Sequence, residues 1–282
     1  MFHPRSFMAL SAIVLLSGCA SAPISTQGHQ TPSVSASTAD SAAPLVYDDY
    51  ARILETYVDD NGLVDYPGLQ ANPEPLKAFI AQLGAVSPAT YEGWEEAEQI
   101  AFLINAYNAI TLESIIAQEP LKNSIRDIVG VWNFKQHQVK GQSLTLDAIE
   151  HDILRQDFVE PRIHAALVCA AISCPPLRRE PYTGAALDAQ LEEQVQQWLA
   201  GPHGLDIDRN ANRVAISAIF DWFGEDWKLQ YSVEEGFTGT AKQRATLNFI
   251  SQYLSAEDQN YLLAGDYKLE YLPYDWSLNR QP

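Results

Sequence analysis

One short segment of the chain contains three residues of the types used in nucleophilic catalysis. Residues 160–177 read EPRIHAALVCAAISCPPL and include His164, Cys169 and Cys174. A thiolate is an effective nucleophile when a base lies within hydrogen-bond reach and a further group orients that base. His164 and Cys169 are five positions apart, which places them on opposite faces of a strand, or about 140° apart on a helix. Cys169 is therefore expected in the core and not beside His164.

Cys174 has a different local sequence, because two prolines and two arginines follow it. Pro175 and Pro176 favour extended backbone at Cys174 and indicate a loop. Arg178 and Arg179 bring positive charge close to the thiol, and positive charge lowers the pKa of a cysteine. Cys174 is therefore the candidate nucleophile, and Arg178 is a candidate binding residue.

The helices that must position these residues carry polar side chains on apolar faces. Residues 96–118 predict a helix that is apolar on nearly all sides, with Asn105 and Asn108 in one stripe. Buried amides need partners, so this stripe either holds a structural hydrogen-bond network or lines a binding site. The helix DAIEHDILR (147–155) carries Glu150 inside its apolar arc. A carboxylate there either forms a structural ion pair or orients a catalytic base.

The first 44 residues have the composition of an export signal followed by a linker. Residues 1–19 combine a basic start, an apolar run and the ending LSGC, which resembles the lipobox of bacterial lipoprotein precursors. The resemblance implies cleavage after residue 18, acylation of Cys19 with palmitate-like chains, and stable membrane anchoring. Ala20 follows Cys19, which favours the outer membrane and a domain facing the periplasm. Residues 19–44 are rich in Ser, Thr, Ala and Pro and predict a flexible tether.

Export to an oxidising compartment leaves two other states open for the remaining cysteine pair. Cys169 and Cys174 could form a disulfide, although so short a loop gains little entropic stabilisation. They could also be buried free thiols that pack as small apolar side chains. Zinc binding by His164 and these cysteines is not supported, because their spacing matches no strong ligand pattern. The sequence therefore predicts neither a metal nor another cofactor.

Composition supports a folded domain over residues 45–282 and excludes one class of partner. Hydrophobic residues make up 46% of the chain, and 36 acidic residues oppose 18 basic ones for a net charge of −18. So acidic a chain repels phosphate backbones, which argues against nucleic-acid binding. No repeat or second linker divides residues 45–282, so we expect a single domain.

Residue patterns predict an α+β fold, rich in helices and with a small antiparallel sheet. Helices are expected at 46–58, 74–84, 96–118, 147–155, 184–200 and 240–255. A hairpin is expected over 132–145 with its turn at Lys140 and Gly141, and a strand or strand-to-helix entry at 213–220. The aromatic segment 267–279 contains Pro273 and predicts an edge strand or a loop.

Several sequence blocks together resemble domain-of-unknown-function family 547. They are AFLINAYNAITL (101–112), SLTLDAIEHDILR (143–155), PRIHAALVCAAISCPPL (161–177), VAISAIFDWFGEDW (214–227) and YDWSLN (274–279). The blocks occur in family order and, with the opening YVDDNGLVDYPGL (57–69), cover nearly all of residues 45–280.

This resemblance implies a fold distantly similar to papain-like and transglutaminase-like cysteine enzymes. Carried over to the matching positions, it implies Cys174 as nucleophile, His164 as base and Glu150 as the group that orients the base. Asn105 would supply a polar or oxyanion contact, and Asn108 would lie beside it as a binding residue. The implied activity is cleavage or transfer of amide bonds in a peptide or other amide substrate, through a thioester at Cys174.

A non-catalytic binding or scaffold domain of the cell envelope is the alternative. The segments 220–231 and 267–276 are aromatic, and exposed Trp or Tyr side chains there would form a ligand face. The simpler interpretation is that these rings fill the core. A buried Cys174 without a cleft, together with a surface groove lined by aromatic residues, would favour the binding domain.

Overall fold

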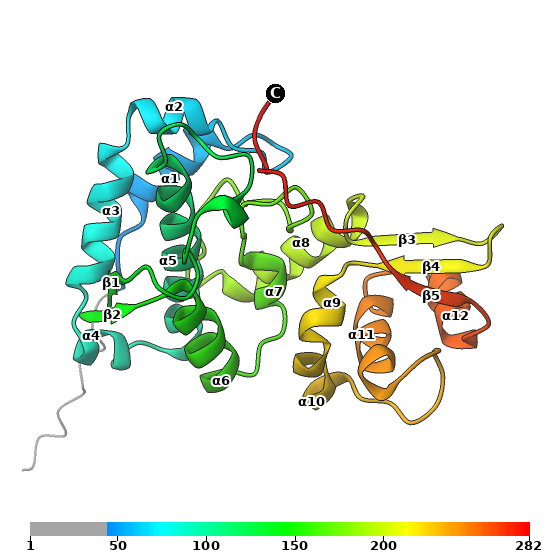
Figure 1. Ribbon diagram of the computed structural model, residues 1–282. Coiled ribbons are helices and arrows are strands. Elements are labelled where there is room, and N and C mark those ends of the chain that lie inside the picture. The colour runs from blue at the N-terminus through cyan, green and yellow to red at the C-terminus, as the bar shows by residue number, and fades with distance from the viewer. Residues whose placement is uncertain (1–43) are drawn as a thin grey trace, which may run out of the picture. The chain divides into compact units, whose positions relative to one another are not determined.

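Helices dominate the part of the chain that the computed structural model describes, residues 44–282 (Figure 1). The first helices are α1 (Asp48–Tyr57), α2 (Tyr66–Ala71), α3 (Glu74–Ala85), α4 (Pro88–Glu92) and α5 (Glu96–Ile116). Next come the 3-10 turn η1 (Ile125–Asp127), strands β1 (His137–Val139) and β2 (Gln142–Leu144), the π-helical segment η2 (Ala148–Leu154), and the short helices α6 (Arg155–Asp157) and α7 (Ile163–Ala166). The predicted export signal, Cys19 and nearly all of the predicted tether lie outside the described residues.

The remaining elements include a three-stranded sheet with helices packed beside it. They are α8 (Leu187–Ala200), β3 (Leu205–Asp208), β4 (Arg213–Ile216), α9 (Ile219–Phe223), the 3-10 turn η3 (Gly224–Trp227), α10 (Lys228–Tyr231), α11 (Ala241–Ser251), α12 (Ala256–Ala264) and β5 (Lys268–Tyr271). The strand order is β3-β4-β5. None of the helices in residues 44–282 has the length and apolar character needed to cross a bilayer.

The structure confirms the α+β class and corrects the expectation of a purely antiparallel sheet. Strands β3 and β4 form an antiparallel pair, whereas β4 and β5 are parallel, with Val214 opposite Leu269. The parallel pairing arises because the chain crosses over through α9 to α12 before it returns as β5. The predicted hairpin turn at Lys140 and Gly141 is confirmed, with positive φ at both residues.

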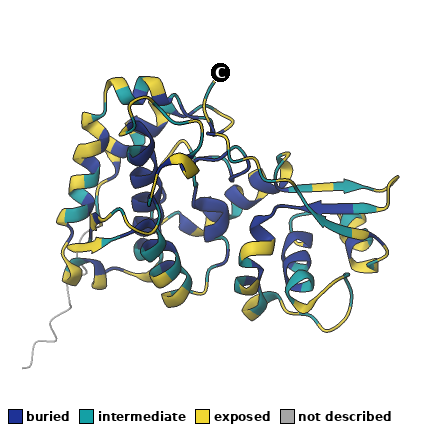
Figure 2. Cartoon of the chain, viewed as in Figure 1, coloured by how far each residue is buried: buried dark blue, intermediate teal, exposed yellow. Residues whose placement is uncertain are grey.

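Helix α5 is the centre of the larger hydrophobic cluster. It is buried along nearly its whole length, as its apolar residues on all sides predict (Figure 2). Residues from α1, α3, η2 and α7 pack into the same cluster, while a second cluster forms around β4, α9 and α11. Tyr274 packs against both clusters and so marks their border.

The extended segment after β5 holds the loop that carries the two cysteines. The backbone N–H of Ile172 donates to the carbonyl oxygen of Ser277 at 2.8 Å, and that of Asn279 donates to the carbonyl of Ala170 at 3.1 Å. Ala170 has a φ of 60°, a left-handed conformation that is costly for a residue with a Cβ and that persists only when its surroundings enforce it. The C-terminal segment supplies part of that enforcement.

Candidate functional site

A single pocket of about 200 Å³ brings together the three residues expected to act in catalysis. It lies where α5, η2, α7, the cysteine loop, α9 and the C-terminal segment meet. Its lining consists of Tyr107, Trp132, Asp147, Glu150, His151, His164, Leu167, Cys169, Cys174, Ile219, Trp222, Phe223, Tyr274 and Trp276. The predicted grouping of Cys174, His164 and Glu150 therefore has a structural counterpart, although their contacts differ from those expected.

Cys169 and Cys174 form a disulfide, the alternative that the sequence left open for this pair, and not the free thiol at Cys174 that the catalytic hypothesis expects. Their Cα atoms lie 6.3 Å apart, within the usual range for a bridge. Cys169 was expected in the core and not beside His164, but both cysteines line the pocket that also contains His164. The loop between them reverses direction at Ala170, so neither regular strand nor helix geometry describes the pair. In this state Cys174 has no thiol to act as a nucleophile.

The sulfur of Cys174 nevertheless lies among groups that would stabilise a thiolate. The backbone N–H of Cys169 donates to Cys174 Sγ at 3.0 Å, and the Tyr274 hydroxyl lies 3.2 Å from each of the two sulfur atoms. Burial, together with the nearby Glu150 carboxylate, raises the pKa of Tyr274, so its hydroxyl remains protonated and able to donate. Donors aimed at a charged group lower its pKa, so after reduction these two hydrogen bonds would act against burial and the carboxylates of the pocket to stabilise a thiolate at Cys174.

Asp226 holds His164 in place. The sequence-based expectation that Glu150 would orient this histidine was wrong. Its Nε2 lies 2.8 Å from Asp226 Oδ2, and its ring is 3% exposed and stacks on Phe223 with centroids 4.5 Å apart. The carboxylate accepts, so Nε2 carries the hydrogen, and Nδ1 is the basic nitrogen of the neutral ring. The histidine therefore has a fixed orientation and one nitrogen for proton exchange.

Asp226 also forms a two-point ion pair with Arg155. Arg155 Nε and a terminal nitrogen donate to the two carboxylate oxygens at 2.6 and 2.9 Å. Burial acts to raise the pKa of Asp226, but the hydrogen bonds from His164 and Arg155 outweigh it and hold that pKa well below its usual value. Asp226 consequently remains a carboxylate over the physiological range and can stabilise an imidazolium at His164.

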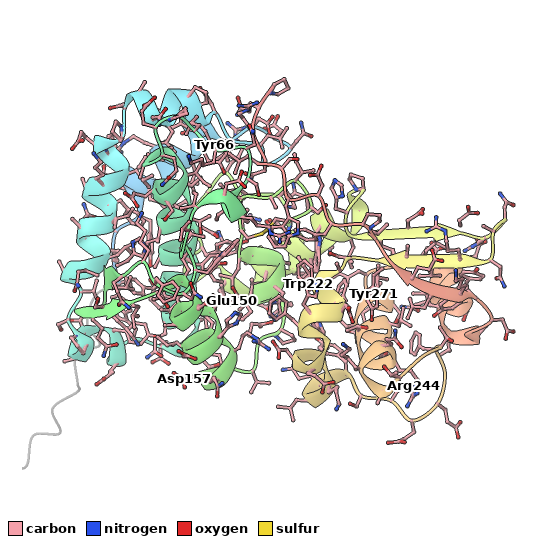
Figure 3. All side chains as sticks on the ribbon, viewed as in Figure 1. Tyr66, Glu150, Asp157, Trp222, Arg244 and Tyr271 are labelled. Carbon is pink, nitrogen blue, oxygen red and sulfur yellow. A yellow bond between two sulfur atoms is a disulfide. The ribbon has the colours of Figure 1, made fainter. Side chains whose placement is uncertain are left out.

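Glu150 also lines the pocket, but it is not the group that orients His164. It is 9% exposed, and among residues 44–282 its one ion-pair partner is His151, at 4.0 Å. Burial and the Glu150 carboxylate together raise the pKa of Tyr107, which is also in the lining. Figure 3 labels Glu150 of η2 and Trp222 of α9, and both line this pocket.

The two asparagines of α5 hold backbone segments and do not face the pocket, which corrects their assignment as binding residues. Asn105 donates to the carbonyl oxygen of Tyr182 at 2.7 Å and accepts from the N–H of Tyr182 at 3.0 Å. Asn108 donates to Ala166 O at 2.9 Å and accepts from the N–H of Val168 at 2.9 Å. Both amides use their donor and acceptor on the backbone, so of the two expectations the structural network was correct.

Arg178 lines a different hollow and is neutralised by neighbouring acids. It pairs with Glu180 and, at 2.7 Å, with Glu193, while Arg179 pairs with Asp60. The hollow that contains both arginines does not include His164 or Cys174. The positive charge expected beside the thiol is therefore used in surface ion pairs, and the thiolate-stabilising groups are the Cys169 N–H and Tyr274.

Sequence reasoning missed the partner of His164 and the aromatic side chains that line the pocket. Asp226 belongs to the block VAISAIFDWFGEDW, and Tyr274 and Trp276 belong to YDWSLN. The signal was present as acidic and aromatic residues inside blocks already singled out, but nothing in the chain order links them to residue 164. Among residues 44–282 no group of three His, Cys, Asp or Glu side chains is placed to hold a metal ion.

Comparison with known proteins gives one match. The model of the family described as a protein of unknown function, DUF547, matches residues 91–199, which supports the family expected from the sequence blocks over that segment. The matched segment contains Glu150, His164 and both bridged cysteines, while Asp226 and Tyr274 lie beyond it. No curated protein and no solved structure matches the chain.

Proposed function

We propose that the domain is a thiol-dependent hydrolase or acyltransferase that acts on amide bonds, with reduced Cys174 as its nucleophile. The observation that carries this proposal is that Cys174 lines the same pocket as His164, whose Nε2 is fixed by Asp226 at 2.8 Å. A nucleophile, a base and a carboxylate that orients the base are the parts that covalent thiol catalysis needs. We also propose that the fold is distantly related to papain-like and transglutaminase-like enzymes.

The reaction begins with reduction of the bridge by a dithiol. One thiolate of the reductant attacks a bridge sulfur, its second thiolate resolves the mixed disulfide, and the products are the oxidised reductant and the thiols of Cys169 and Cys174. Cys174 then gives its proton to His164 Nδ1 and attacks the amide carbonyl carbon. The Cys169 N–H and the Tyr274 hydroxyl, the donors beside Cys174 Sγ, stabilise first the thiolate and then the oxyanion.

The same histidine completes the cycle. The tetrahedral intermediate collapses to a thioester at Cys174 as the amine leaves with the proton held by His164. Water, or an acceptor amine in a transfer reaction, gives a proton back to His164 and attacks the thioester, which regenerates the thiol. Asp226 stabilises the imidazolium in each half-reaction and fixes the tautomer.

The proposed setting is the bacterial cell envelope. Cys19 would carry the lipid anchor, residues 19–44 would form the tether, and the domain would face the periplasm from the outer membrane. The membrane and a peptide or amide substrate are then the partners, and the dithiol would be a periplasmic thiol protein or small molecule.

The test uses the variant Cys169→Ala, which cannot form the bridge, and Cys174→Ala as the matched control. We expect iodoacetamide to alkylate Cys174 of Cys169→Ala with a pH midpoint clearly below the free-cysteine value of about 8.5. With p-nitrophenyl acetate as the probe, the same variant should give a burst of nitrophenolate and an acetyl thioester at Cys174. A midpoint at or above about 8.5 and no acyl adduct would overturn the proposal.

The bridge and the aromatic lining favour a second candidate, a non-catalytic binding domain. In the bridged state the pocket offers rings and carboxylates but no nucleophile. The same experiment decides between them, because a binding domain predicts that Cys174 stays unreactive after reduction and that the bridge serves only to hold the loop.

A further inference from the structure

One wall of the pocket is built from aromatic rings, of which one is exposed and three are half-buried. We call Trp132, Trp222, Tyr274 and Trp276 the aromatic wall. Trp222 is 46% exposed, and its ring stacks on Trp276 with centroids 5.7 Å apart and lies 4.7 Å from Tyr274. The face of an aromatic ring carries partial negative charge and attracts cations. Arg126 already lies over Trp276 with its guanidinium carbon 5.2 Å from the ring centroid, so this wall accepts a cation in the described state.

Two carboxylates complete the same pocket, one on η2 and one on the residue directly before it. Asp147 and Glu150 belong to the lining, which contains no Lys or Arg in the described chain. Glu150 is the informative one: it is a 9% exposed carboxylate that accepts a hydrogen bond from Tyr107 and feels the charge of Arg155, yet its one ion-pair partner in residues 44–282 is His151, at 4.0 Å. Arg155, on the next turn, gives its guanidinium to Asp226.

The chemistry of the lining excludes several alternative ligands. An anion would meet two carboxylates and aromatic faces, both of which repel negative charge. A purely apolar group would match the rings but would bring no positive charge to Glu150, whose one ion-pair partner in the described chain is His151, at 4.0 Å. A group that is positively charged satisfies both halves of the pocket at once.

We infer that this pocket binds a cationic group of the substrate, an ammonium or quaternary ammonium, between Glu150 and the aromatic wall. A volume of about 200 Å³ suits a group the size of a side chain and not a whole polymer. The inference rests on the proposed function in that the cation would belong to the amide substrate, placed beside Cys174. It names the substrate class as amides that bear a positively charged side chain or terminus.

Binding is tested on the oxidised wild-type domain with choline as the probe. The matched ligand is 3,3-dimethylbutan-1-ol, which has the same shape without the charge, and sodium chloride controls for ionic strength. Titrations followed by NMR should show choline binding at least about tenfold more tightly than the alcohol. n-Butylammonium in the same assay separates recognition of a primary ammonium from that of a quaternary one. Equal affinity for choline and the alcohol, or no binding of either ammonium, would overturn the inference.

Variants assign the site within the domain. Glu150→Gln should weaken choline binding about tenfold while binding of the neutral alcohol is unchanged, and Glu92→Gln, an exposed acid outside the pocket, should have no effect. Trp222→Ala removes an exposed ring and tests the aromatic wall even if Glu150→Gln does not fold. Unchanged choline affinity in folded Glu150→Gln and in Trp222→Ala would place the cation elsewhere and refute the site.

The two proposals fail in different ways. Choline titration uses the bridged protein and needs no thiol, whereas alkylation of Cys174 needs no cationic ligand. Choline binding together with an inert Cys174 would leave a cation-binding domain and reject the hydrolase. A reactive Cys174 with no choline or butylammonium binding would retain the hydrolase and reject the substrate class.

Discussion

The buried polar groups of helix α5 and those of the pocket use their hydrogen bonds differently. Asn105 and Asn108 each bind one N–H and one carbonyl of the backbone, at 2.7 to 3.0 Å. Glu150 has a similar degree of burial but finds its one ion-pair partner, in residues 44–282, at 4.0 Å. The asparagines hold the chain in place, while Glu150 accepts from Tyr107 but has no Lys or Arg within ion-pair distance in the described chain.

His164 and Asp226 stand between these extremes. Their hydrogen bond is as short as those of the asparagines, yet His164 lines the pocket and can change charge during a reaction, while Asp226 keeps the carboxylate that stabilises it. These residues follow one pattern. A buried side chain whose hydrogen bonds all go to the backbone stabilises the fold, whereas a charged side chain without a close ion-pair partner, or one that exchanges a proton, belongs to the site. Variants at Asn108, Asp226 and Glu150 test this pattern by separating stability from function.

The largest loss of stability is expected for Asn108→Ala. This change leaves the carbonyl of Ala166 and the N–H of Val168 buried without partners, so the free energy of unfolding should fall by about 3 kcal/mol. Urea unfolding at neutral pH measures it, with Asn248→Ala, which loses one partly buried hydrogen bond to Tyr231, as the milder control. A loss below about 1 kcal/mol would show that the two backbone contacts are dispensable.

An intermediate loss is expected for Asp226→Asn, and this loss should depend on pH. Asp226 is 22% exposed and binds both His164 and Arg155, so the unfolding free energy should fall by about 2 kcal/mol at pH 7. Its pKa is lower in the folded state than the usual 3.8, so the ionised carboxylate stabilises the fold above that value. The same change should also slow alkylation of Cys174 in the Cys169→Ala background, because His164 loses its orienting group.

The acid range provides the control for that prediction. Below about pH 5 the unfolded chain begins to take up a proton at Asp226 before the folded chain does, so the wild-type advantage should shrink as the pH falls towards the lowered pKa. Urea unfolding of wild type and variant at several pH values follows the difference. A difference that stays constant from neutral to acid pH would mean that the ion pair does not stabilise the fold.

The smallest effect on stability is expected for Glu150→Gln. The amide oxygen can still accept from Tyr107, and the lost charge interaction with Arg155 is minor because Asp226 holds that guanidinium, so the unfolding free energy should stay within about 0.5 kcal/mol of wild type. Cation binding should nevertheless be weakened, as argued above. A stability loss above about 1 kcal/mol would assign Glu150 to the fold and remove the contrast with the asparagines.

The sequence predicted the longer helices α1, α3, α5, α8 and α11 because their signals are local, but it did not predict α12 or the short helices α2, α4, α7 and α10. The apolar pattern of α5, the turn at Lys140 and Gly141, and the entry from β4 into α9 are all set by neighbouring residues. The parallel pairing of β4 with β5 was not predictable in this way, because it depends on a crossover of some fifty residues between them.

The candidate site divides along the same line. Cys174, His164 and Glu150 were found from types and spacing, and they line one pocket. The Asp226 partner of His164 lies 62 residues away along the chain, Tyr274 lies 105 residues from Cys169, and the bridge depends on a loop with a left-handed residue at Ala170. The aromatic wall likewise joins residues that are far apart in the sequence. Arg178 does not bring its charge to Cys174, because it pairs with Glu193 on α8 and with Glu180 in the loop before α8.

The attachment of the C-terminal segment to the cysteine loop has a consequence for biogenesis. Tyr274 is translated 100 residues after Cys174, and the backbone partners of Ala170 and Ile172 come later still. During synthesis the two thiols therefore emerge long before the residues that cover them. Over that interval they are open to mixed disulfides with other proteins, so pairing within the chain competes with a kinetic hazard that ends only when the C-terminal segment docks.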